Sequence, residues 1–164
     1  MNGEAKNLFI SHAHQDDAAL QGLCDLLRRN GYNIRNSSID STKPNEATSE
    51  EYIKYKILKP RIDWAGTMLV LISPVTHTRP WVDWEIECAQ RQGKRIVGVY
   101  VQGGQESNLP ASFQMYGDAL VGWQADRVMA ALEGSLNTLF QSDNKTEFPE
   151  RDIDRFTCGE PEPL

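Results

Sequence analysis

The residues Thr-Met-Leu-Val-Leu-Ile-Ser at positions 67–73 form the strongest strand pattern in the chain. Apolar side chains point to both faces of this extended segment, so a strand here would be buried on both sides. Such strands are typical of the centre of a parallel sheet that helices cover. Shorter apolar runs at 8–10 and 96–101 predict two more buried strands, and weaker patterns at 32–40 and 119–123 predict two others.

Helical patterns separate these strands. Leu20, Leu23, Cys24 and Leu27 have helical spacing, and Gly31 follows where a helix ends. Further helices are predicted over 48–58, with Pro60 ending or kinking the helix, over 78–91, briefly within 102–116, and along the stripe Val128, Leu132, Leu136 and Leu139. Strands that alternate with helices in this way predict an α/β domain, with a parallel sheet and helices on both faces.

The composition fits one globular domain. The chain has 164 residues, of which 40% are hydrophobic and 24% charged, and its formal net charge is −6. The segment from residue 141 onward has seven acidic and three basic residues, so it carries −4 of that charge. We therefore predict a domain at 1–140 and an acidic, flexible tail at 141–164. An acidic balance argues against a nucleic-acid partner, which would require a basic face, but not against a small anionic substrate.

The sequence shows no targeting or membrane-spanning pattern. No apolar run approaches the roughly 20 residues of a membrane span, and residues 1–9 lack the basic and apolar regions of a signal peptide. Three cysteines, Cys24, Cys88 and Cys158, have no paired spacing. We therefore expect a cytoplasmic protein with no membrane partner.

Ligand sites in open α/β sheets lie outside the carboxyl ends of the strands. The corresponding segments here are 11–16, 40–46, 73–81 and 102–108. The first contains His12, His14 and Asp16, a spacing that could hold a metal ion. His77 is the only other histidine in the sequence, so further ligands are scarce and we expect no metal site. Asp16 as a helix N-cap is the plain alternative.

The third segment leads to Trp81 and Glu85, which are four residues apart and so share one face of a helix. A carboxylate beside an indole can stabilise a cationic sugar, and the ring can stack on a base. Most helical glutamates are solvated and most helical tryptophans belong to the core, so the pattern also permits a structural role. The GxSxG, GxGxxG and GxxxxGK[ST] motifs of serine hydrolases and nucleotide-binding folds are absent.

Five short motifs have the order and spacing of a known family. They are KNLFISH at 6–12, the segment 31–40 with Gly-Tyr-x-Ile and Asp40, MLVLISP at 68–74, W-x-x-x-E at 81–85, and GKRIVGV at 93–99. Over residues 6–140 the chain thus resembles a TIR (Toll/interleukin-1 receptor) domain, of the bacterial group found in Thoeris-type antiphage defence. The resemblance implies a flavodoxin-like fold with a central five-stranded parallel sheet.

The resemblance also implies an activity. Enzymes of this family cleave NAD at its nicotinamide bond with the helix glutamate, which is Glu85 here, and Trp81 lies beside it. Ser11, His12 and Asp40 match positions around the nucleotide, and Lys43 would contact a phosphate. The product would be an ADP-ribose-derived signal for an effector protein. NAD is then the substrate, no other cofactor is needed, and other TIR protomers are the expected partners.

Some positions depart from the family pattern. Ala13 and His14 stand where enzymatic animal members often carry arginine, and Trp84 stands where the family is usually polar. A non-catalytic TIR adaptor that acts by TIR–TIR assembly is therefore the alternative. A receiver domain is disfavoured, because Ser73 and Pro74 follow the third strand where a receiver has its phospho-acceptor aspartate.

Overall fold

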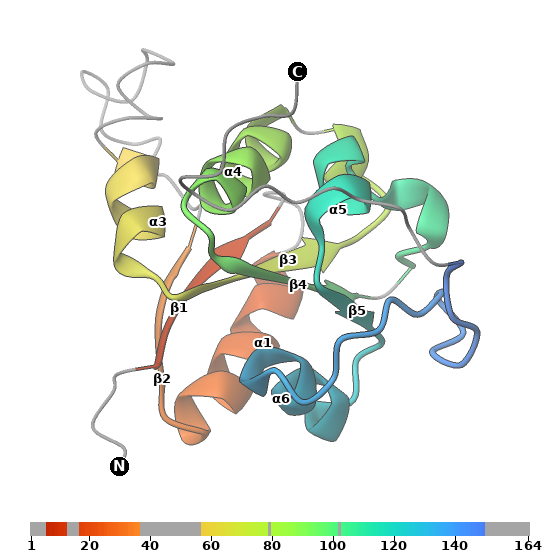
Figure 1. Cartoon of the computed structure of the whole chain (residues 1–164). Coiled ribbons are helices and arrows are strands. Elements are labelled where there is room, and N and C mark those ends of the chain that lie inside the picture. The colour runs from red at the N-terminus through yellow and green to blue at the C-terminus, as the bar shows by residue number, and fades with distance from the viewer. Residues whose placement is uncertain (1–5, 13–16, 37–56, 79, 102, 150–164) are drawn as a thin grey trace.

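The computed structural model describes residues 6–12, 17–36, 57–78, 80–101 and 103–149, and its centre is a parallel five-stranded sheet (Figure 1). The strands are β1 (Lys6–Ser11), β2 (Tyr32–Asn36), β3 (Thr67–Ile72), β4 (Arg95–Tyr100) and β5 (Ala119–Val121). Their spatial order is β2-β1-β3-β4-β5, which is the flavodoxin-like order. The predicted fold class and the five strands are confirmed.

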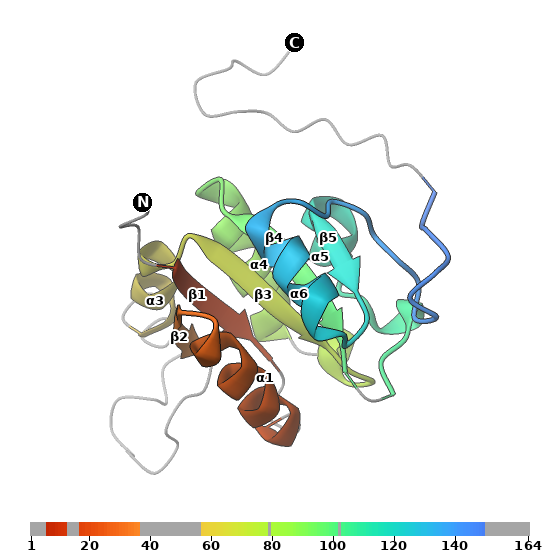
Figure 2. The ribbon, with the colours of Figure 1, turned by 90° about the horizontal axis from the view of Figure 1, so that it is seen from below.

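Helices cover both faces of the sheet (Figures 1 and 2). One face carries α1 (Asp17–Arg29) and α6 (Ala125–Glu133). The other carries α3 (Lys59–Trp64), α4 (Pro80–Arg91) and α5 (Ala111–Tyr116), and we call it the α3–α5 face. Two short 3₁₀ helices, η3 (Thr76–Thr78) and η4 (Glu106–Asn108), lie in the connections that follow β3 and β4.

The core has two halves because β3 is apolar on both sides, as its sequence predicts. Leu69 and Leu71 pack among the side chains of α1 and α6. Met68, Val70 and Ile72 pack on the α3–α5 face. On that face, Gly98 of β4 leaves room for Phe113, because a Cβ at Gly98 would lie 2.6 Å from the Phe113 ring. The close approach of α5 to the sheet therefore requires glycine at this position.

Two helix boundaries differ from the sequence prediction. Pro60 does not end the helical segment: residues 57–58 have π-helical backbone, and α3 continues from there to Trp64 with Pro60 in its first turn. The last helix ends at Gly134, whose φ of 91° is left-handed, so Leu136 and Leu139 do not extend the helical stripe. They pack instead on opposite halves of the core. The predicted continuation of the second strand beyond Asn36, and the helix predicted before residue 57, lie outside the described residues.

The chain beyond α6 continues the domain. Thr138 O accepts from Leu120 N at 3.1 Å, and Phe140 N donates to Leu120 O at 2.9 Å, so this segment pairs with β5. It then folds back, with Phe148 N donating to Leu139 O at 2.8 Å. Packing on the core thus continues past the predicted boundary at residue 140, because Phe148 packs against the α3–α5 face. Residues 150–164 of the predicted tail lie outside the described part. No described helix is long and apolar enough to cross a membrane.

Candidate active site

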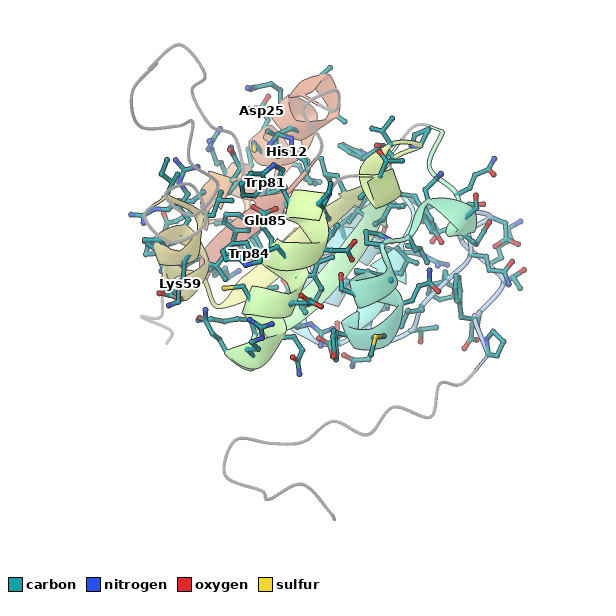
Figure 3. All side chains as sticks on the ribbon, turned by 90° about the horizontal axis from the view of Figure 1, so that it is seen from above. His12, Asp25, Lys59, Trp81, Trp84 and Glu85 are labelled. Carbon is teal, nitrogen blue, oxygen red and sulfur yellow. The ribbon has the colours of Figure 1, made fainter. Side chains whose placement is uncertain are left out.

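The candidate site lies at the carboxyl end of β1, between that strand and α4. Ser11 is the last residue of β1, His12 follows it, and both are buried. Phe9 packs on the α3–α5 face, and Ser11 lies two residues further along the strand, so its side chain points to the same face. Glu85 comes from α4, which covers this face. Figure 3 shows His12, Trp81 and Glu85 close together beside α4.

Glu85 occupies a helix position that is otherwise apolar. The buried residues of α4 include Val82, Ile86 and Ala89, which form one stripe against the sheet, and Glu85 lies within that stripe. Its side chain is 0% exposed. The general expectation of a solvated helical glutamate therefore does not hold here.

Only one oxygen of the buried carboxyl group is bonded. Ser11 Oγ donates a hydrogen bond of 2.6 Å to Glu85 Oε1. Among the described residues, Glu85 Oε2 is the one buried side-chain oxygen or nitrogen without a hydrogen-bond partner. Buried polar atoms are nearly always bonded, so an unbonded carboxyl oxygen indicates a position where a ligand can donate a hydrogen bond.

The surroundings of Glu85 favour its neutral form when no ligand is bound. Burial raises the pKa of Glu85 to about 8, although the Ser11 hydrogen bond and the charge of Arg61 both act to lower it. The physical cause is the loss of water around the carboxylate, which costs more free energy than these two interactions return. A perturbed carboxyl group beside aromatic side chains is a frequent property of catalytic sites.

Two tryptophans of α4 flank Glu85. Trp81 lies one turn before it, and Trp84 lies directly before it. Both are half-buried and pack against the core of the α3–α5 face. In Figure 3, Trp81 lies toward His12, whereas Trp84 lies toward α3 and Lys59. Of the two tryptophans, Trp81 is thus the one that lies on the His12 side of the carboxyl group.

Two arginines connect β2 to α3, and the charge of one of them, Arg61, acts on Glu85. Arg61 Nη1 donates to the backbone oxygen of Asn36 at 2.7 Å. The Arg35 guanidinium stacks over the Trp64 ring, 4.4 Å from its centre. Burial lowers the pKa of Arg61, and the nearby charge of Arg35 lowers it further, whereas the charge of Glu85 raises it. No sequence motif singles out Arg61, because its nearness to Glu85 arises only from the packing of α3 beside α4.

The predicted site residues are brought together only in part. Ser11, His12, Trp81 and Glu85 lie at one place, whereas Asp40 and Lys43 lie outside the described residues. His14 and Asp16, the other members of the metal pattern, also lie outside them. In the ranges that the structure describes, no group of three or more His, Cys, Asp or Glu is arranged to hold a metal ion.

The sheet order, the flanking helices and the buried glutamate of W-x-x-x-E define a TIR-like α/β domain. The family described as "Thoeris protein ThsB, TIR-like domain" matches residues 9–106. The chain therefore belongs to this family of TIR-like domains from Thoeris antiphage defence. A comparison with curated proteins gave no match.

Solved structures with a similar fold include three bacterial proteins of low identity. A 2-deoxyribosyltransferase from Bacillus psychrosaccharolyticus is 14% identical, with a TM-score of 0.59 over 74% of this chain and 89% of its own. A conserved protein from Enterococcus faecalis V583 is 11% identical, with a TM-score of 0.57 over 81% of this chain and 100% of its own. The CMP N-glycosidase BcmB of Clostridium botulinum is 16% identical, with a TM-score of 0.51 over 80% and 100%. At these identities the likeness shows the fold alone.

Proposed function

We propose that this domain cleaves NAD at the bond between nicotinamide and ribose, with Glu85 as the catalytic carboxylate. The observation that carries the proposal is the buried Glu85 carboxyl group, with Oε1 bonded to Ser11 and Oε2 unbonded within the described residues. A ribose hydroxyl of the substrate is a donor of the right kind for Oε2. The proposed substrate-binding residues are Trp81, Ser11 and His12 beside it, together with Asp40 and Lys43, which the sequence resemblance implies.

The chemistry suits a single carboxylate. Nicotinamide is attached as a cationic pyridinium, so its C1′–N bond breaks with both electrons returning to the ring, and a neutral base leaves. No general acid is needed, unlike the paired acids of O-glycoside hydrolysis. The carboxylate stabilises the positive charge that develops on the ribose. Water, or a hydroxyl of the same molecule, then adds to C1′ and loses its proton.

Binding of the substrate would convert the Glu85 carboxyl group to its charged form. A pyridinium cation beside Glu85 favours the carboxylate, because an opposite charge nearby lowers the pKa of an acid. A site that holds a neutral carboxyl group when empty can thus become anionic when NAD binds. This avoids a permanently buried charge, which would cost free energy in the empty protein.

The family, that of Thoeris TIR-like domains, supports the proposal. Proteins named a 2-deoxyribosyltransferase and a CMP N-glycosidase share the fold, so this fold is compatible with such activities. For this chain we propose that the product is ADP-ribose, a cyclic isomer or a conjugate, and that it signals to an effector protein. Association with other TIR protomers would form the active species in the cytoplasm.

Nicotinamide release from NAD tests the proposal. Purified protein over a range of concentrations, with and without lysate of phage-infected cells, is incubated with NAD, and the products are separated by chromatography. Glu85→Gln is expected to lower release about 100- to 1,000-fold, because it removes the charge that stabilises the transition state. Glu87→Gln is the matched control, since it removes one charge from the exposed side of the same helix. Release that persists in Glu85→Gln would remove its assigned role, and no release under any condition would favour the adaptor alternative.

A further inference from the structure

Two arginines join the end of β2 to α3 through reciprocal contacts. Arg35 of β2 stacks on Trp64 of α3, and Arg61 of α3 donates to the backbone oxygen of Asn36, the residue that follows Arg35. Arg61 and Trp64 are three residues apart, so they lie on adjacent turns of one helix face. The two guanidinium groups are therefore held at the same end of β2.

The strand register places this pair on the face of the sheet that carries Glu85. Arg35 lies opposite Phe9 of β1, and Phe9 packs on the α3–α5 face. Ser11 is two residues beyond Phe9 and bonds Glu85. Side chains of adjacent strands in register share a face, so Arg35 lies on the same side as Ser11 and Glu85.

The electrostatics are consistent with this placement. The charge of Arg35 lowers the pKa of Arg61, so the two cations repel one another. The charge of Arg61 lowers the pKa of Glu85, so it acts on the carboxyl group itself. An anion bound between the arginines would relieve their repulsion. Arginine is also suited to oxyanions, because its planar fork donates parallel hydrogen bonds, and stacking on an indole leaves the in-plane donors directed outward.

We propose that Arg35 and Arg61 form an anion subsite that binds the diphosphate of the substrate whose ribose lies at Glu85. The proposal rests on the proposed NAD cleavage, and it deepens that function by naming the residues that would hold the diphosphate. The diphosphate is joined to the 5′ carbon of the ribose that Glu85 would contact. The carboxyl group and the arginines thus bind adjoining parts of one molecule. Oε2 accepts a hydrogen bond from a ribose hydroxyl, and the two guanidinium groups donate hydrogen bonds to the diphosphate.

Binding of ADP-ribose tests the subsite without any reaction. Isothermal titration calorimetry compares wild type with Arg35→Gln, Arg61→Gln, Arg61→Lys and Lys94→Gln. Each glutamine variant of the arginines is expected to bind ADP-ribose about 10- to 100-fold more weakly, the range for loss of a charge-assisted hydrogen bond. Arg61→Lys keeps the charge and is expected to bind with intermediate affinity. Lys94→Gln is the matched control. Lys94 is also a cation bonded to α3, because its Nζ donates to Asp63 O at 3.2 Å, but it lies before the amino end of β4, away from the carboxyl ends of the strands.

Substrate discrimination provides the second readout. Wild type is expected to prefer NAD over nicotinamide riboside, which has no phosphate, and the ratio of the two kcat/KM values should fall about 10- to 100-fold in Arg61→Gln. A variant that merely loosened α3 would lower both values together and leave the ratio unchanged. Thermal unfolding identifies any variant that fails to fold. If Arg61→Gln does not fold, the comparison is made with Arg35→Gln and Arg61→Lys instead.

The two proposals fail in different ways. Equal ADP-ribose affinity in wild type and both folded arginine variants, or no binding by wild type, would overturn the subsite. Arginine-dependent ADP-ribose binding without any release of nicotinamide would support the subsite and overturn NAD cleavage.

Discussion

Glu85 contradicts the local pattern of its own helix. A charged side chain stands in the apolar stripe of α4, where Val82 and Ile86 contact the core. Natural sequences tolerate such a conflict mainly at functional sites, because burying a carboxylate lowers stability. The protein limits this cost by bonding one oxygen to Ser11 and by keeping the carboxyl group neutral over much of the pH range.

This ionisation predicts how stability depends on pH. Burial raises the pKa of Glu85 from 4.5 to about 8, so the folded state binds more protons than the unfolded state between these values. The stabilisation of the folded state that comes from the raised pKa of Glu85 is fully present below pH 4.5 and is lost as the pH rises through about 8. We expect the free energy of unfolding to fall by roughly 4 kcal/mol across this window through Glu85.

Urea denaturation at several pH values from 5 to 9 measures this effect. The side chain in Glu85→Gln cannot ionise, so the free energy of unfolding of this variant should not show the fall with rising pH that Glu85 causes. At pH 9 it should exceed that of wild type. Glu87→Gln, with the exposed glutamate changed, should follow wild type. Parallel curves for wild type and Glu85→Gln would show that the buried group does not titrate as described.

Ser11 predicts a change in the pH profile of activity. Its hydroxyl donates to Glu85 Oε1 and so lowers the pKa of this carboxyl group. Without that hydrogen bond the carboxylate is less stable, and Ser11→Ala should shift the rising limb of kcat/KM for NAD to higher pH by about one unit. Ser73→Ala changes a buried serine that pairs with Thr76 after β3, and should leave the limb in place. An unshifted limb in Ser11→Ala would mean that Ser11 does not act through Glu85.

The sequence predicts some site residues and not others for a physical reason. Helical spacing places Trp81 beside Glu85, the end of a strand makes Ser11 and His12 candidates, and the resemblance to TIR domains assigns these residues their roles. Arg61 lies 24 residues before Glu85, on α3, whose span from Lys59 to Trp64 the sequence pattern does not predict. Its role depends on packing between α3 and α4, which no local motif encodes.

Helix α4 carries the catalytic candidate, so its attachment to neighbouring elements fixes the site. Asp83 Oδ1 accepts hydrogen bonds from Ser112 N at 3.1 Å and from Ser112 Oγ at 2.5 Å. These bonds join the first turn of α4 to α5. On the other side, α4 packs against α3, and both helices contribute buried apolar residues, Ile62 and Val82 among them, to the same half of the core. The position of Glu85 therefore depends on contacts from both neighbouring helices.

The link between α4 and α5 predicts a loss of stability on substitution. Asp83→Asn removes the charge that strengthens both hydrogen bonds to Ser112, which is 4% exposed. The expected loss is about 1–2 kcal/mol in the free energy of unfolding, measured by urea denaturation at pH 7. Glu87→Gln makes the same change of charge on the exposed side of α4 and should cost less than about 0.5 kcal/mol. Equal effects of the two variants would contradict a specific link.

The strands were easier to predict than the ends of the helices. The apolar runs of β3 and β4 have to be buried on both faces, and this requirement is local to the sequence. The end of α6 depends on a single residue, Gly134, whose left-handed backbone overrides the leucine stripe beyond it. A stripe of apolar residues cannot by itself distinguish a longer helix from a segment that turns and packs elsewhere on the core.

The whole molecule closes one edge of its sheet with the chain beyond α6. The residues around Leu139 pair with β5, and Asn144 Oδ1 accepts from Gly122 N at 2.9 Å. Asn144 has a φ of 61°, a left-handed value that asparagine adopts more readily than most residues. Edge strands expose unpaired backbone groups, so this segment protects β5 from pairing with other chains. It also belongs to the folded unit, although its charge alone suggests a tail.

Truncation tests where the folded unit ends. Removing residues 150–164, whose acidic, proline-containing sequence predicts a flexible tail, is expected to change the melting temperature by less than about 2 °C. Removing 137–164 deletes the pairing with β5, the packing of Leu139 and Phe148, and the bond from Tyr100 Oη to Phe140 O at 3.0 Å. These losses sum to roughly 4 kcal/mol or more, so the melting temperature should fall by about 10 °C or the protein should fail to fold. Scanning calorimetry of both truncated chains beside the full chain measures the difference. An equal loss in both would place the boundary within 150–164, and no loss in either would restore the boundary near residue 140.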